Sequence, residues 1–132
     1  MNIDYDVIIA DINKRNEKNS ITLISFDKYN AGSFQQKLLD YNYYLVKFSQ
    51  LASGMNQPLM EMQRLFLLDK IRIQENPITQ WMFSNVVLKR GYTGLVTIDK
   101  TNADSNKIDC VASMADALGG YLIAPSYGFN VW

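Results

Sequence analysis

The first half of the chain contains one apolar segment with helical spacing and another that is almost continuously apolar. Apolar residues recur at helical spacing from Tyr5 to Ile12, and the polar run over residues 13–19 is expected to end this helix. The segment is short and rich in β-branched residues, so a strand over residues 5–9 is the alternative. Residues 21–26 are almost continuously apolar, which is typical of a strand buried on both faces of a parallel sheet.

A helix and a second strand are predicted next. Asn30 is a suitable N-cap for a helix that continues to about Asn42, and residues 44–48 form the next apolar run. The order strand, helix, strand predicts a β-α-β unit with a right-handed crossover. The small and polar residues 49–56 are expected to form a loop, and Pro58 is expected to open the following helix.

The second half of the chain predicts a short helix and a β-hairpin. Asn76 and Pro77 form a strong helix start, because asparagine caps helices and proline suits the first helical position. Residues 86–89 and 95–98 are apolar runs joined through glycines, a pattern typical of a β-hairpin with a loop of several residues.

A last helix is expected over residues 106–118, with Gly119 and Gly120 ending it. The sequence therefore predicts a single domain over residues 1–132 with an α/β fold. Its parts are a short, mostly parallel sheet flanked by helices and a β-hairpin.

Composition excludes several classes of function. The 132 residues are enough for one domain with a real core. The 13 basic and 13 acidic residues cancel, so net charge does not indicate strong nucleic-acid binding.

Histidine is absent, which excludes Ser-His and Cys-His catalysis and imidazole zinc sites. The lone Cys110 forms no internal disulfide, so a cytoplasmic location is expected, and no apolar run is long enough to span a membrane.

Two aspartates are candidate metal ligands. Asp27 follows the first strand, and open α/β sheets bind ligands beyond the carboxyl ends of their strands. The alternative, that Asp27 begins a turn or caps the next helix, is common for aspartate. Asp109 lies in the opening turn of the last helix, where the helix dipole stabilises a carboxylate without any further role. Asp99 and Asp104, before this helix, could also approach a metal.

Several motifs resemble a known family when they are taken in order along the chain. They are FDKYNA from Phe26, NPITQWMFSNVVLKR from Asn76, TIDK from Thr97 and KIDCVASMADALG from Lys107. Over most of its length the chain resembles the nuclease end of the large terminase subunit of tailed bacteriophages, a family that cuts and packages viral DNA. The resemblance implies a ribonuclease H-like fold, of which this chain would be the C-terminal part.

The resemblance also implies roles for individual residues. Asp27 matches the second metal-binding acid of the family, and Asp109 matches the last one. Lys100 and Lys107 match basic positions that could contact a phosphate. Two Mg²⁺ or Mn²⁺ ions about 4 Å apart would then activate a water and stabilise the leaving oxygen of a phosphodiester.

Other charged residues keep alternatives open. Lys89 and Arg90, at the hairpin tip, are candidate contacts to the DNA backbone with low sequence specificity. Lys100 and Lys107 are equally well explained as solvated loop charges. Asp116 could extend the acidic cluster or face water, and exposure to water is favoured.

The family's first acid is expected upstream of every motif matched here. Asp4, Asp6 or Asp11 would replace it only if the N-terminal segment were a strand. We therefore expect weak or no cleavage by this chain alone. The implied partners are double-stranded DNA, the remaining large-subunit segment, the small terminase subunit or portal, and a second copy of the chain across an exposed strand edge. The alternatives are a non-catalytic interaction or DNA-binding module, or a prophage remnant.

Overall fold

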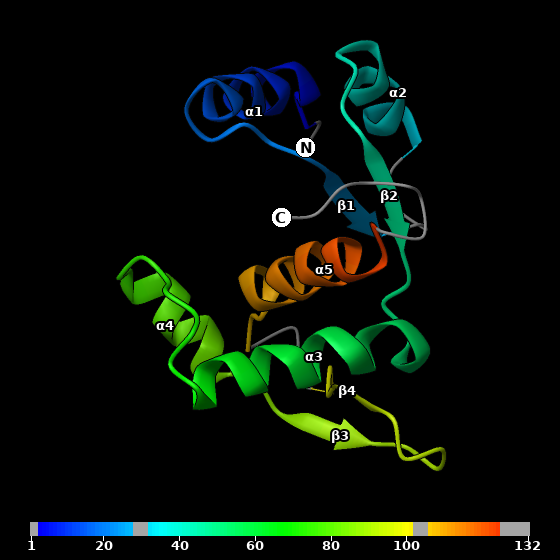
Figure 1. Cartoon of the computed structure of the whole chain (residues 1–132), viewed down its shortest axis with the longest axis vertical. Helices are drawn as coiled ribbons and strands as arrows, with labels where there is room; N and C mark the ends of the chain where they lie inside the picture. The colour runs from blue at the N-terminus through cyan, green and yellow to red at the C-terminus, as the bar shows by residue number, and fades with distance from the viewer. Residues whose placement is uncertain (1–2, 28–31, 102–105, 125–132) are drawn as a thin grey trace.

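The computed structural model describes residues 3–27, 32–101 and 106–124. Along the chain its elements are α1 (Tyr5–Asn19), β1 (Ile24–Asp27), α2 (Gly32–Asp40), β2 (Leu45–Phe48), α3 (Ala52–Leu67), α4 (Pro77–Ser84), β3 (Leu88–Arg90), β4 (Val96–Ile98) and α5 (Asp109–Ile123). In Figure 1, α1 and α2 lie on one side of the β1–β2 pair, α5 crosses the middle, and α3 with the β3–β4 hairpin lies beyond α5. In the described part of the chain no helix is long and apolar enough to cross a membrane.

The N-terminal segment is helical, as its apolar spacing predicted. The Asp4 side chain caps α1 by accepting a hydrogen bond of 3.0 Å from the Asp6 backbone N–H. The prediction that the polar run would end the helix is wrong, since α1 continues to Asn19 before Ser20 takes a left-handed conformation. Charged residues such as Lys14 and Glu17 are good helix formers, and they extend the helix on its solvent side.

The predicted β-α-β unit is confirmed. Strands β1 and β2 pair in parallel, and α2 connects them. Asp27, the last residue of β1, lies opposite Phe48, the last residue of β2. Leu38 of α2 is 1% exposed and fixes the connecting helix to this unit. Both strands therefore end at the same edge, where the chain leaves β2 through Gln50.

Helix α3 begins earlier than predicted. Residues 49–56 were expected to form a loop, yet α3 starts at Ala52 and contains Pro58 in its interior. Proline removes one backbone donor from a helix. Met55 is 2% exposed and Pro58 itself is buried, so apolar packing holds the first turns of α3 despite the missing donor.

Helix α5 passes through the two glycines that were expected to end it. A Cβ atom on Gly119 would lie 2.2 Å from the Phe48 ring, and one on Gly120 would lie 2.7 Å from the Ser25 Cβ. The absence of side chains at these positions lets α5 lie directly against β1 and β2. These glycines therefore serve close packing, and the helix ends only at Ile123.

The main core joins α3, the hairpin and α5. Strands β3 and β4 pair antiparallel, as predicted, and Val96 and Ile98 of β4 are buried in this core. Asn56 of α3 accepts a hydrogen bond of 2.8 Å from the Val96 backbone N–H. Beyond α3, the Asn76 side chain caps α4 as predicted. The core members are Phe48, Met55, Leu59, Met62, Val96, Ile98, Ile108, Val111 and Ala115.

Candidate metal centre at the end of the parallel strands

Asp27 lies at the carboxyl end of β1, in the position that the sequence predicted. Asp27 is partly buried and lies opposite Phe48 in the strand register. Parallel strands of an α/β sheet direct the side chains that follow them toward this edge. The carboxylate is therefore placed where such folds hold ligands.

Asp116, in the third turn of α5, was expected to face water, and this prediction is wrong. Its residue is 7% exposed. Gln50 Nε2 donates a hydrogen bond of 2.8 Å to Asp116 Oδ2. Asp116 Oδ1 is buried and accepts no hydrogen bond from the described residues. Asp116 is buried because the glycine contacts bring α5 against the strands, and the helical pattern alone did not contain this information.

Burial raises the pKa of the Asp116 carboxyl, and the neighbouring charge of Asp27 raises it further. The hydrogen bond from Gln50 and the charge of Lys100 act in the opposite direction. Lys100 Nζ donates a hydrogen bond of 3.2 Å to Gln50 Oε1. Lys100, which the sequence analysis named as a possible phosphate contact, is therefore linked to the Asp116 carboxylate through Gln50.

Asp109 occupies the first turn of α5, as predicted, and is exposed. This end of the helix lies beside α4, where the Cys110 backbone N–H donates to Met82 Sδ at 3.4 Å. Asp109 is on the same stripe of α5 as Asp116 but about 10 Å farther along the axis. The described residues contain no group of three acids, cysteines or histidines that could hold a metal. The pairing of Asp27 with Asp109 stays a prediction.

The remaining acids serve other contacts. The hydrogen bonds from Thr101 lower the pKa of Asp99, first through its side chain and then through its backbone. Asp104 lies outside the described residues. The N-terminal segment is helical, so its acids do not lie on a strand and do not replace the family's first metal-binding acid. Asp6 pairs with Lys37 at 2.7 Å, and Asp11 pairs with Arg15 at 2.8 Å.

The other basic candidates lie on the hairpin and in the segment before α5. Lys89 and Arg90 belong to β3 and are exposed. Arg90 Nη1 donates a hydrogen bond of 2.6 Å to the Gly94 carbonyl, so its side chain folds back over the hairpin turn. Lys107 is exposed, and its backbone carbonyl accepts a hydrogen bond of 2.8 Å from Asn85 Nδ2.

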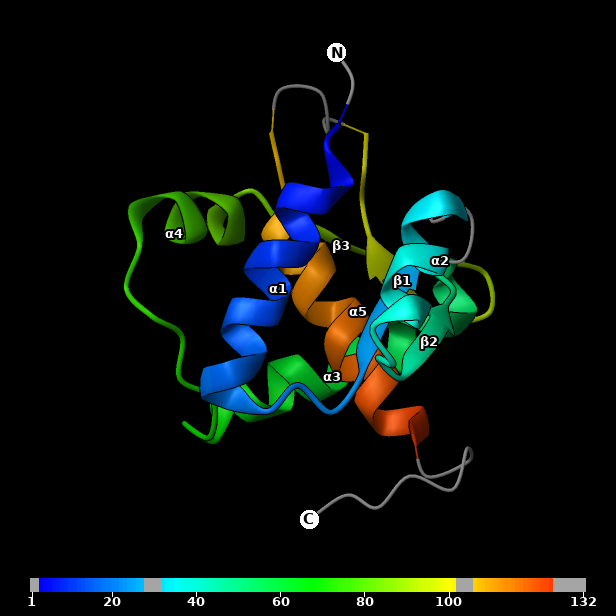
Figure 2. The same cartoon turned by 90° about the horizontal axis from the view of Figure 1, so that it is seen from above.

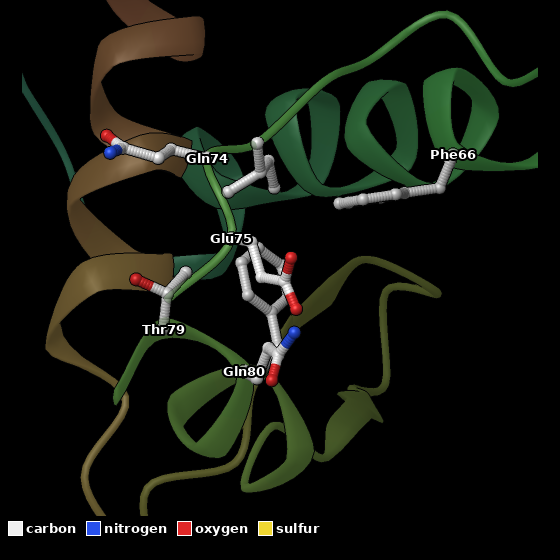
Figure 3. Close-up of a pocket in the computed structure, with 7 residues that line it drawn as sticks. Phe66, Gln74, Glu75, Thr79 and Gln80 are labelled. Carbon is white, nitrogen blue, oxygen red and sulfur yellow. The ribbon is translucent and has the colours of Figure 1, made fainter. Parts of the chain in front are cut away.

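A hollow of about 390 Å³ between α3 and α4 is a second place where a ligand could enter. In Figure 3 the side chains of Phe66, Glu75, Thr79 and Gln80 surround it. Glu75 is the only ionisable group among its lining residues. One carboxylate without a second acid or a base does not make a catalytic arrangement, so the end of β1 remains the better candidate.

Sequence reasoning favoured exposure to water for Asp116, with extension of the acidic cluster as the alternative, and it missed Gln50. The spacing from Asp109 to Asp116 repeats on one helix stripe, but it does not show whether that stripe is buried at Asp116. Gln50 follows directly after the second strand, at the edge where ligands gather, but it was assigned to a loop and received no role.

The geometry described above defines an α/β domain with one acid, Asp27, at the end of a parallel strand and a second, Asp116, buried in the helix that packs beside it. The profile of the family described as "Terminase large subunit, endonuclease domain" matches residues 1–124. The chain therefore belongs to this family. No curated protein sequence matches the chain.

A solved structure, described as the crystal structure of the HK97 bacteriophage large terminase, has a similar fold. It superposes with a TM-score of 0.78 at 23% sequence identity, over 89% of this chain and 25% of that chain. The ribonuclease H-like α/β fold expected from the sequence is thus confirmed. The chain spans about a quarter of the length of the large terminase that it matches.

Proposed function

We propose that this chain contributes a divalent-cation site to the nuclease of a phage DNA-packaging terminase, which hydrolyses double-stranded DNA in the host cytoplasm. The observation that carries the proposal is the position of Asp27 at the carboxyl end of β1, in a member of the terminase endonuclease family. Asp27 and Asp109 are the proposed metal ligands. The small terminase subunit, the portal and other large-subunit segments are proposed partners.

The donor set suits Mg²⁺ or Mn²⁺. Terminase nuclease domains are generally metal-dependent. Hard cations bind carboxylate oxygens. Asp116 Oδ1 is buried near Asp27 and has no hydrogen-bond partner among the described residues, so it is the kind of atom that a cation would satisfy. Bound ions of this kind supply a nucleophilic water at neutral pH and stabilise the leaving oxygen.

The chain's own residues would orient the DNA at this site. Lys100, which is hydrogen-bonded to Gln50 near the carboxylates, would contact the scissile phosphate. Lys107, Lys89 and Arg90 are exposed and would contact the DNA backbone without reading its sequence. The described residues gather no set of three acids, so we expect cleavage by this chain alone to be weak.

A thermal-shift titration with Mn²⁺ tests the metal site. Binding at a concentration of one hundred times Kd adds about 2.7 kcal/mol of stability. For a domain of this size that corresponds to a rise of roughly 5–10 °C in melting temperature. Asp27→Asn should abolish this rise, and Asp109→Asn should reduce it. Asp40→Asn, which removes the same charge from the surface of α2, is the control.

Plasmid nicking tests the nuclease assignment itself. Any Mn²⁺-dependent nicking should disappear in the Asp27→Asn and Asp109→Ala proteins. Nicking that survives Asp109→Ala would remove that residue from the proposed ligands.

The second candidate function is an interaction or DNA-binding module without catalysis. The zero net charge and the lack of a set of three acids among the described residues favour a module without catalysis. The absence of any Mn²⁺-induced rise in melting temperature, together with retained DNA binding, would support the module over the nuclease.

A further inference from the structure

Packing explains why the Asp116 carboxylate is buried, but it does not explain why one of its oxygens lacks a partner among the described residues. Its residue is 7% exposed, and Asp116 Oδ1 has no hydrogen-bond partner among the described residues. Leaving a charged oxygen buried without a partner costs free energy, so nearly all such atoms in proteins find one. Gln50 satisfies only the other oxygen, Oδ2.

The packing of α5 places this carboxylate near Asp27. Gly119 and Gly120 bring α5 against Phe48 and Ser25, and Figure 2 shows α5 crossing beside β1 and β2. Asp116 is bonded to Gln50, the second residue after β2, and Asp27 is the last residue of β1, opposite the end of β2. The charge of Asp27 acts on Asp116, so the two carboxylates lie near each other at this edge.

Two neighbouring carboxylates repel each other when both are ionised, and a divalent cation bound between them removes this repulsion. Each negative charge makes the other more costly to bury, and a divalent cation reverses the sign of this interaction. Mg²⁺ and Mn²⁺ are commonly held by one or two carboxylates with water completing their coordination. The pair formed by Asp27 and Asp116 has the composition that such an ion requires.

We propose that Asp116 is a ligand of the cation site, binding through Oδ1 opposite Asp27, so that α5 contributes to the site from its third turn. Gln50 is the positioning residue, because it holds Oδ2 and leaves Oδ1 directed to the ion. Lys100, bonded to the far side of Gln50, keeps the amide oriented. This inference rests on the proposed function, since it assigns a ligand to the same site.

Mn²⁺ binding to the intact chain, followed by electron paramagnetic resonance of the free ion, tests the assignment without any need for cleavage. Asp116→Asn keeps the shape of the side chain and should raise the Kd for Mn²⁺ at least a hundredfold. Gln50→Ala should raise it about tenfold, the usual effect of removing a residue that orients a ligand. Glu75→Gln, in the hollow between α3 and α4, removes the same charge and should leave the Kd within twofold.

The outcomes separate the inference from the proposed function. If Asp27→Asn abolishes Mn²⁺ binding while Asp116→Asn stays within threefold of the unaltered chain, the inference is overturned and the proposed function stands. If Asp27→Asn leaves binding unchanged, the proposed function fails first. Should Asp116→Asn not fold by circular dichroism, an unchanged Kd in Gln50→Ala overturns the inference in its place.

Discussion

Two turns of the same helix, α5, hold aspartates in opposite environments. Asp109, in the first turn, is exposed beside α4, and the positive end of the helix dipole stabilises its charge. Asp116, in the third turn, is buried near the end of the parallel strands, and one of its oxygens has no hydrogen-bond partner in the part of the chain that the structure describes. The two residues share one stripe of the helix and the same chemistry.

The difference between the two turns comes from what α5 packs against. Its first turn meets a short helix, α4, and its later turns meet strands β1 and β2 through glycines that carry no side chain. Close packing excludes water from around Asp116, whereas Asp109 stays in contact with water. A motif resemblance identifies Asp109 from the sequence, whereas the burial of Asp116 follows only from its neighbouring elements.

The largest expected effect comes from Gly119→Ala, which should disturb the third turn and leave the first one intact. The added Cβ would lie 2.2 Å from the Phe48 ring, so either α5 or the ring must shift. Overpacking costs about 1–3 kcal/mol, and alanine regains up to about 1 kcal/mol of helix propensity. Urea unfolding should therefore show a net loss of about 1–2 kcal/mol.

Gly91→Ala is the matched control for this substitution. A Cβ on Gly91 would meet nothing within 4 Å, so its stability should stay within about 0.5 kcal/mol of the unaltered chain. Equal stability of both variants would contradict the close approach of α5 to β2.

A smaller effect is expected from Asp116→Asn in metal-free buffer. Because burial raises the pKa of Asp116, the folded protein binds a proton more readily there than the unfolded chain does. The stability from this group is present at low pH and is lost as the pH rises through the raised pKa. At pH 7 the asparagine variant should therefore melt a few degrees higher, by roughly 1 kcal/mol.

This gap should close as the pH falls below about 3, where the aspartate is protonated in both states. Melting curves between pH 3 and pH 8 in metal-free buffer measure it. A gap that widens on acidification would contradict the raised pKa of Asp116.

The smallest effect is expected from Asp109→Asn, and its sign is opposite. A carboxylate in the first turn of a helix contributes about 0.3–1 kcal/mol through the helix dipole. The variant should lose that amount at pH 7 and low ionic strength, and the loss should shrink in high salt. A gain in stability would show that the first turn resembles the third, and the contrast between the two turns would be lost.

Much of the fold follows from short-range sequence signals. The Asn76 cap, the apolar run that became β1 and the two runs of the hairpin each depend on neighbours a few residues away. Predictions failed where long-range packing outweighed these signals. Pro58 was expected to open a helix and lies inside one, and Gly119 was expected to end a helix and supports its contact with Phe48.

The sequence by itself determined the order of the elements, the strand that carries Asp27 to the sheet edge, and the helix start that carries Asp109. These depend on periodicity, capping and turn preference, which act between near neighbours. Only the tertiary structure decided that Asp116 is buried beside that edge and bonded to Gln50. The reason is physical: burial and electrostatic coupling depend on distances between elements, and those distances arise when α5 packs against the strands.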